Sequence, residues 1–237
     1  MEPTVYMIPS VLNKDAIETI PAYVIASIKK CQVFFVENER TSRRFLKKIS
    51  KEVVIDDYEW FTIAKHENES QQMIELFTQK IKEKKNIGII SEAGCPGIAD
   101  PGQQLVAIAH RHKAWVKPLV GPSSILLALM ASGLNGQQFQ FVGYLPIEQL
   151  AKVRALKELE SESKKKNCTQ VFIETPYRNN QLLETILKTC MSSTVLCIAA
   201  NLTAESEMIQ TKTISEWKKV IPDLHKQPVV FCLLSTQ

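Results

Sequence analysis

The fold is decided by the stretch IGIISEAGCPGIADPGQQLVAIA, residues 87–109. Its first four residues form a short apolar run that predicts a buried β-strand. Asp100 and Pro101 predict the start of a helix, with Asp100 as the N-cap and Pro101 at the first helical position. The stretch therefore predicts a strand and a helix joined by a loop at residues 91–102.

Elements of the same two kinds continue on both sides of this unit. Short apolar runs alternate with segments of helical period, which predicts an α/β fold with a mostly parallel sheet covered by helices. The clearest helix has Met73, Ile74, Phe77 and Ile81 on one face, with Lys80 and Lys82 outside. Strands are predicted in the N-terminal part at residues 5–8, 32–36, 53–55, 87–90 and 115–119.

A second set of elements follows, which predicts a second α/β domain. Its predicted strands lie at residues 140–143, 170–173, 194–199, 208–213 and 229–234. Because the last two are close in sequence, we expect antiparallel pairing and therefore a mixed sheet. The domains are predicted at residues 1–119 and 120–237.

Composition bounds the class of protein. The 237 residues are 45% hydrophobic and 23% charged, as in a soluble globular protein. No apolar run is long enough to span a membrane and no signal peptide is recognisable, so a cytoplasmic protein is expected. The net charge of +4 permits a polyanionic partner without requiring one. The six cysteines contain no CxxC pair, and we expect neither a metal site nor disulfides.

Glycine placement indicates where a ligand binds. All eight glycines lie between Gly88 and Gly143, so the turn after the first strand, around Pro9, has no dinucleotide-binding fingerprint. The loop at residues 91–102 instead exposes backbone groups at the carboxyl end of a strand, where open α/β sheets bind ligands. Glu92 there either contacts a ligand or fixes the loop, and Asp100 either caps the helix or takes part in catalysis.

A second loop, VGPSS at residues 120–124, opens a strongly apolar helix. Free N–H groups and the positive end of the helix dipole at such a start bind carboxylates. Alternatively, Ser123 and Ser124 only cap the helix.

These loops carry a resemblance to a known family. SEAGCPGIADPG followed by GPSS and by FVGYLP (141–146) resembles the tetrapyrrole-methylase superfamily. VENERTSRRFL (36–46), Asn68-Glu69 and FIETPYR (172–178) resemble motifs of its branch of small-subunit ribosomal RNA ribose 2′-O-methyltransferases acting on a cytidine. The resemblance extends over essentially the whole chain.

The resemblance implies two α/β domains, S-adenosylmethionine (SAM) as cofactor in a cleft between them, a homodimer, and ribosomal RNA or the small ribosomal subunit as partner. By position in the family's motifs, it implies cofactor contacts from Pro9, Glu92, Gly94, Pro96, Ile98, Ser123, Ser124 and Thr175.

The chain departs from the family pattern at several positions. Asn38 and Glu92 replace aspartates, the segment at 7–13 lacks a glycine, Glu148 falls in a string that is basic in the family, and AANLTAESE (199–207) lacks three charged or basic side chains. These departures leave the cofactor site in place but put the exact RNA substrate in doubt.

For the chemistry, a ribose hydroxyl is weakly acidic, so a nearby base helps methyl transfer. Glu37, after the strand at 32–36, is the first candidate, with Arg40 positioning phosphate; Glu174 is the second. Alternatively, Glu37 and Arg40 form an ion pair that fixes the loop. Two other functions stay open: carbon methylation of a corrin or porphyrin precursor, and a SAM-binding protein that has lost catalysis.

Overall fold

The computed structural model describes residues 2–63 and 67–235, with only the backbone described at residues 67–70. The side chains of Asn68 and Glu69, which carry part of the resemblance, therefore lie outside the described residues. The chain divides into two compact units, Met1–Ser123 and Ser124–Gln237. No helix in the described chain combines the length and apolarity needed to cross a bilayer.

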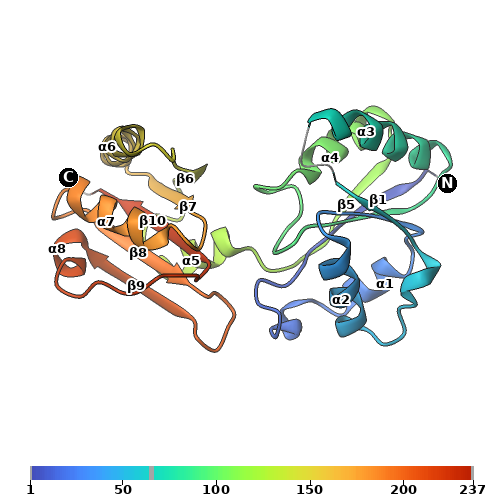
Figure 1. Cartoon of the computed structure of the whole chain (residues 1–237), viewed down its shortest axis with the longest axis horizontal. Coiled ribbons are helices and arrows are strands. Elements are labelled where there is room, and N and C mark those ends of the chain that lie inside the picture. The colour runs from blue at the N-terminus through green and yellow to red at the C-terminus, as the bar shows by residue number, and fades with distance from the viewer. Residues whose placement is uncertain (1, 64–66, 236–237) are drawn as a thin grey trace. The chain divides into compact units, whose positions relative to one another are not determined.

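The first unit is built on a five-stranded, fully parallel sheet with the order β3-β2-β4-β1-β5, of which Figure 1 labels β1 and β5. In register, Val5 of β1 lies between Ile87 of β4 and Val116 of β5. The strands are β1 (Thr4–Ile8), β2 (Val33–Val36), β3 (Glu59–Thr62), β4 (Ile87–Ile90) and β5 (Trp115–Pro118).

Helices cover both faces of this sheet, as the continuous apolar runs of its strands require. Successive residues of a strand point to opposite faces, so Val5 and Met7 join the core beneath α3 and α4, whereas Tyr6 and Ile8 join the core beneath α1 and α2. The helices are α1 (Tyr23–Ile28), α2 (Glu39–Ile49), α3 (Glu67–Lys82) and α4 (Gly102–Arg111), with a short 3-10 turn, η1, at Ile17–Thr19.

Two expectations for this unit are wrong. Residues 53–55 form no strand: Val53 and Ile55 are buried in irregular chain that leads into a 3-10 turn, η2 (Ile55–Asp57), and the strand is β3, which follows. Core burial alone therefore produced the apolar pattern that suggested a strand. Lys80 does not lie outside α3 but is buried and pairs with Glu59 of β3.

The second unit contains a mixed sheet with the order β6-β7-β10-β8-β9. Strands β6 and β7 are parallel, and the other three neighbouring pairs are antiparallel. The strands are β6 (Phe139–Tyr144), β7 (Thr169–Ile173), β8 (Val195–Ala200), β9 (Met208–Thr213) and β10 (Val229–Leu234), and the helices are α5 (Ser124–Ser132), α6 (Gln149–Lys166), α7 (Asn179–Thr189) and α8 (Ile214–Trp217). The predicted class, a parallel N-terminal α/β unit followed by a mixed C-terminal one, is confirmed, although β9 and β10, whose nearness in sequence suggested antiparallel pairing, pair with the two sides of β8 and not with each other.

Candidate functional site

The loops after β1 and β4 are joined by backbone hydrogen bonds at the carboxyl edge of the parallel sheet. The N–H of Ser10 donates to the carbonyl of Gly94 at 2.8 Å, and the N–H of Gly94 donates to the carbonyl of Ser10 at 3.1 Å. Gly94 has a φ of +72°, and a Cβ there would lie 3.3 Å from the Leu12 side chain. Glycine is therefore required for this junction both by its backbone conformation and by its close packing.

The loop after β5 packs against the same edge. A Cβ on Gly121 would lie 2.1 Å from the Cβ of Pro9, so the two loops touch at a point where no side chain fits. The Sγ of Cys95 lies 3.5 Å from the carbonyl oxygen of Pro122. Three loops that are far apart in sequence thus form one packed edge.

Asp100 organises the loop at residues 91–102 from inside. Its Oδ1 accepts hydrogen bonds from the N–H of Gly97 at 2.9 Å and from the N–H of Gly102 at 2.6 Å. The predicted position of the N-cap is wrong by one residue, because α4 begins at Gly102 with Pro101 as its N-cap, but Asp100 still accepts a hydrogen bond from the first N–H of the helix. Its Oδ2 is buried and has no hydrogen-bond partner among the described donors.

Glu37 reaches this loop from the end of β2. Its Oε1 accepts a hydrogen bond from the N–H of Glu92 at 3.0 Å. Burial raises the pKa of Glu37 to about 7, and the neighbouring Asp100 carboxyl group adds to the rise. The predicted ion pair between Glu37 and Arg40 is wrong, because within the described chain the Glu37 carboxylate has no cation within 4 Å.

The candidate cofactor residues are divided between the two units. In the first unit, Pro9, Gly94 and Pro96 are buried beside the packed edge, and they shape its backbone. Glu92 and Ile98 are exposed on the loop, and Ser123 is partly exposed. In the second unit, Ser124 is the first residue of α5 and Thr175 follows β7.

Glu174, the second candidate base, is already engaged. Its Oε1 accepts hydrogen bonds from the N–H of Thr175 at 2.7 Å and from Nη2 of Arg178 at 2.6 Å. The Glu174 side chain is fully buried, and Arg178 balances its charge. A carboxylate held in this way fixes the turn after β7 and is poorly placed to accept a substrate proton.

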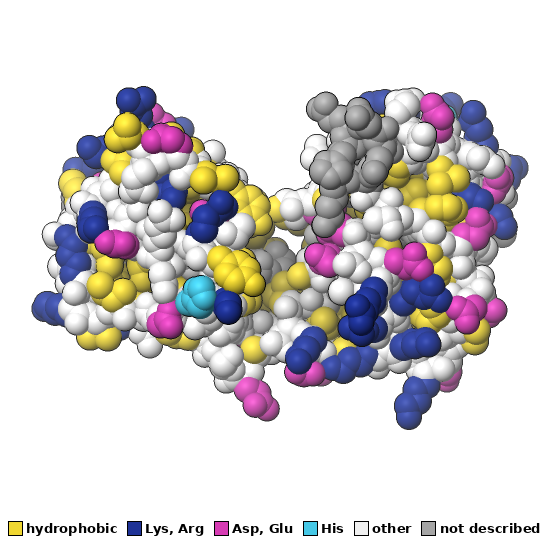
Figure 2. All heavy atoms as spheres, in the orientation of Figure 1, with side chains coloured by type: hydrophobic (Ala, Val, Ile, Leu, Met, Phe, Trp, Pro, Cys, Tyr) yellow, Lys and Arg dark blue, Asp and Glu magenta, His cyan; other side chains and the backbone are white. Residues whose placement is uncertain are grey.

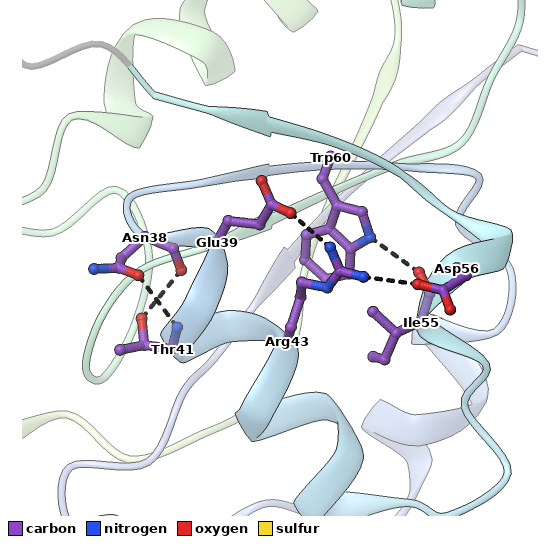
Figure 3. A network of polar contacts seen from close by, with 7 residues as sticks. All are labelled: Asn38, Glu39, Thr41, Arg43, Ile55, Asp56 and Trp60. Atoms are coloured by element: carbon purple, nitrogen blue, oxygen red, sulfur yellow. Dashed lines mark hydrogen bonds and ion pairs between the residues drawn. The ribbon is translucent and has the colours of Figure 1, made fainter.

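Helix α2 is held in a fixed rotation by Arg43 (Figure 3). Its guanidinium bonds to Glu39 at 2.7 Å and to Asp56 at 2.7 Å, and lies 5.7 Å from the centre of the Trp60 ring. The Trp60 Nε1 in turn donates to the carbonyl of Ile55 at 3.0 Å. Because one face of α2 is anchored in this way, the face that carries residues 41, 44, 45 and 48 has a defined direction.

Two of the departures from the family pattern have structural roles. Asn38 is the N-cap of α2, and its side chain accepts a hydrogen bond from the N–H of Thr41 at 3.2 Å (Figure 3). Glu148 is the N-cap of α6 and accepts bonds from the N–H groups of Leu150 and Ala151. Both replacements are residues that satisfy free N–H groups at a helix start.

Sequence reasoning missed the contact of Glu37 with Glu92 and the basic lining of a pocket beside α2. The contact of Glu37 with Glu92 forms because β2 and β4 are neighbours in the sheet, and this strand order cannot be predicted from the sequence. The basic lining of the pocket has a sequence signal: Thr41, Arg44, Phe45 and Lys48 share one helix face by their spacing of three and four residues.

Comparison with known proteins gives one consistent family. A family model described as Tetrapyrrole (Corrin/Porphyrin) Methylases matches residues 16–218. The chain is similar to the protein named Ribosomal RNA small subunit methyltransferase I of Vibrio cholerae, with 34% identity over 65% of this chain and 52% of the relative. It is similar to the protein of the same name of Bacillus subtilis, with 27% identity over 89% of this chain and 68% of the relative. The chain thus spans about half to two thirds of the length of these curated relatives.

Solved structures share the fold. A diphthine synthase gives a TM-score of 0.67 at 14% identity, covering 98% of this chain and 89% of that chain. The methyltransferase CobJ gives a TM-score of 0.63 at 13% identity, covering 98% of this chain and 93% of that chain. At such identities the likeness concerns the fold alone.

Proposed function

Because this chain belongs to the tetrapyrrole (corrin/porphyrin) methylase family, we propose that it transfers a methyl group from SAM to a ribose 2′-hydroxyl of small-subunit ribosomal RNA. The family match confirms the resemblance recognised in the sequence and the predicted class, a family of SAM-dependent methyltransferases. The choice of RNA is carried by the similarity to proteins named Ribosomal RNA small subunit methyltransferase I.

The first unit offers groups that suit SAM. The loop at residues 91–102 presents backbone N–H and C=O groups of the kind that bind adenosine and amino-acid moieties. Ile98, which is 51% exposed, offers an apolar surface, and the exposed Glu92 carboxylate offers a negative charge to a sulfonium. Pro9, Gly94 and Pro96 fix the loop, and Ser123, Ser124 and Thr175 are proposed as further cofactor contacts.

When bound, SAM supplies an electrophilic methyl group on a positively charged sulfur. The chain's own task is to align the acceptor oxygen and to accept its proton. Glu37 suits the second task, since a pKa raised to about 7 makes its carboxylate a stronger base than an ordinary glutamate and leaves roughly half of it ionised at neutral pH. Arg40, exposed on the first turn of α2, binds a phosphate of the acceptor strand.

The proposal extends to assembly and location. A homodimer follows from the family resemblance, and the second unit exposes large apolar side chains such as Met130, Ile147 and Leu150, which suit an interface. Sedimentation of the purified chain tests this directly, and a monomer at micromolar concentration contradicts it. Action on the small ribosomal subunit places the protein in the cytoplasm.

A thermal unfolding experiment tests the cofactor. SAM and S-adenosylhomocysteine bind only the folded chain, so both raise the unfolding midpoint by mass action, whereas adenosine at the same concentration has a smaller effect. If neither ligand shifts the midpoint, the cofactor assignment fails.

A methyl-transfer experiment tests the acceptor. Tritiated SAM is offered with undermethylated small subunits, with naked ribosomal RNA and with a tetrapyrrole precursor. Label in the RNA at a ribose supports the proposal, and label in the tetrapyrrole alone overturns it. SAM binding without transfer to any acceptor indicates a binding protein. In single turnover with saturating SAM, Glu37→Gln slows transfer, and an unchanged rate removes Glu37 from the chemistry.

A further inference from the structure

A cavity of about 510 Å³ lies in the first unit between α2 and the loop after β1. Its volume falls in the range of about 300–1,000 Å³ that is typical of small-molecule sites. We call it the α2 pocket. Of the candidate cofactor residues, only Glu92 lines it, so it is a separate compartment that shares one wall with the proposed cofactor loop.

Three cationic side chains line the α2 pocket: Lys14, Arg44 and Lys48. Glu92 is the single acidic residue among the lining residues. Within the described chain no carboxylate lies within 4 Å of Arg44 or Lys14, whereas the neighbouring Arg43 is saturated by two carboxylates. The charge of Arg44 is thus available to an anionic ligand, and Figure 2 shows Lys and Arg side chains gathered on the surface over α2.

One of the three cations, Lys48, is held in place before any ligand binds. The Nζ of Lys48 pairs with Asp15 at 3.0 Å and also donates to the carbonyl of Lys14, which ties α2 to the loop after β1. Arg44 and Lys48 are four residues apart on the helix and therefore lie on one face. Positive charges that share one helix face suit the phosphates of a nucleic-acid strand.

The remaining wall is apolar. The apolar residues among those that line it are Val11, Leu12, Ile17 and Phe45. A ligand with a flat, weakly polar ring and an anionic backbone can pack its ring on the apolar wall and place its charge against the cationic wall. An unpaired nucleotide has this composition. A nucleotide within a duplex does not, because its base is stacked and paired.

The α2 pocket is coupled to the proposed cofactor loop. Ser10, which lines the pocket, forms the two backbone bonds with Gly94, and Leu12 packs against the position where a Gly94 side chain would be. A ligand in the pocket therefore contacts the segment that is bonded to the cofactor loop. Methyl transfer requires the acceptor to lie beside the donor, and this compartment adjoins the loop at Glu92.

We propose that the α2 pocket binds one unpaired nucleotide of the acceptor RNA, with Arg44, Lys48 and Lys14 on its phosphates and the apolar wall against its base and ribose. This inference rests on the proposed function and adds the mode of acceptor recognition to it.

The test compares three cations of the same helix, two that line the pocket and one that does not. Arg44→Ala and Lys48→Ala remove cations of the pocket, and Lys47→Ala removes an exposed cation of α2 that does not line it. Binding of a short fluorescein-labelled single-stranded RNA to the full chain is measured by anisotropy over a range of salt concentrations. The expected result is a loss of about tenfold in affinity for each pocket variant, as for one charge-assisted phosphate contact, and less than about twofold for Lys47→Ala.

Two further measurements separate this inference from the proposed function. SAM binding, measured by calorimetry, is expected to be equal in the wild type and in all three variants. If the wild type methylates RNA but Arg44→Ala and Lys47→Ala weaken RNA binding equally, the pocket inference fails while the proposed function stands. If a labelled RNA duplex binds as tightly as the single strand and with the same dependence on Arg44, the unpaired nucleotide is excluded. If a polycarboxylate tetrapyrrole binds with that dependence and RNA does not bind, both proposals fail.

Discussion

The backbone N–H of Glu92 donates a 3.0 Å hydrogen bond to the carboxylate of Glu37, a residue 55 positions earlier in the sequence. This contact ties the end of β2 to the loop after β4, its neighbour in the sheet. The carboxyl group of Asp100, at the other end of the same loop, contributes to the raised pKa of Glu37, and the buried Oδ2 of Asp100 has no hydrogen-bond partner among the described residues. Protonation of Glu37 removes the repulsion between these two carboxyl groups, so it favours the folded arrangement of the loop.

Glu37→Gln is expected to stabilise the chain at alkaline pH. The pKa of Glu37 is raised from 4.5 to about 7 in the folded state, so the folded chain binds this proton more tightly than the unfolded chain. The contribution of Glu37 to the free energy of unfolding is therefore largest below about pH 4.5 and is lost as the pH rises through about 7. Glutamine resembles the protonated form of Glu37 at every pH, so the variant keeps this contribution to the free energy of unfolding when the pH rises. Calorimetry is expected to give an unfolding midpoint about 2–4 °C above wild type at pH 8 and little change at pH 5.

The control for this prediction is Glu18→Gln, which changes an exposed glutamate of η1. Its midpoint is expected to follow the wild type at both pH values. If the unfolding midpoint of Glu37→Gln differs from that of the wild type by the same amount at pH 5 and at pH 8, the raised pKa of Glu37 is contradicted.

Asp100→Ala is expected to destabilise the first unit and to weaken SAM binding. The substitution leaves the N–H groups of Gly97 and Gly102 without their acceptor, which costs about 1–3 kcal/mol. The loop at residues 91–102 then loses the constraint that shapes its exposed backbone. Urea unfolding and calorimetric titration with SAM measure the two effects. Asp100→Asn keeps an acceptor oxygen and is expected to retain most of the stability and most of the SAM affinity. If both variants lose these properties equally, the hydrogen bonds from Gly97 and Gly102 are not what shapes the loop.

Gly121→Ala is expected to disturb the packing of the loop after β5. The new methyl group falls 2.1 Å from the Cβ of Pro9, so one of the two loops must move, at a cost of about 1–3 kcal/mol. Gly136→Ala is the matched control, because a Cβ there meets nothing within 4 Å. Denaturant unfolding is expected to separate the two variants, and equal stabilities would show that the edge has room to adjust.

Arg43→Ala and Arg44→Ala are expected to differ although the residues are adjacent. Arg43 makes two partly exposed ion pairs and lies over Trp60, so its loss is expected to reduce the unfolding free energy by about 1 kcal/mol. Arg44 has no such partner among the described residues, and its loss is expected to change stability by less than about 0.5 kcal/mol. Circular dichroism melts measure both. A destabilised Arg44→Ala variant would assign Arg44 a structural role in place of ligand binding.

Local sequence determined several features of this protein. Apolar strands alternating with helical periods were enough for the α/β class and for the parallel and mixed sheets, because burial on one or both faces of a sheet imposes these periods directly. The loop at residues 91–102 and the role of Asp100 as an acceptor at the start of α4 were likewise recognisable, since turn and cap chemistry depends on near neighbours.

The tertiary structure alone decided the contacts between segments that are distant in sequence. Whether residues 53–55 or Glu59–Thr62 form the strand beside β2 depends on which of them reaches the edge of the sheet, and both carry apolar residues. The partner of Glu37 is the N–H of Glu92 and not Arg40 because strand order brings the ends of β2 and β4 together, and an ion pair predicted from spacing ignores that order. Periodicity reports which side of an element is buried, but it carries no information about which other element buries it.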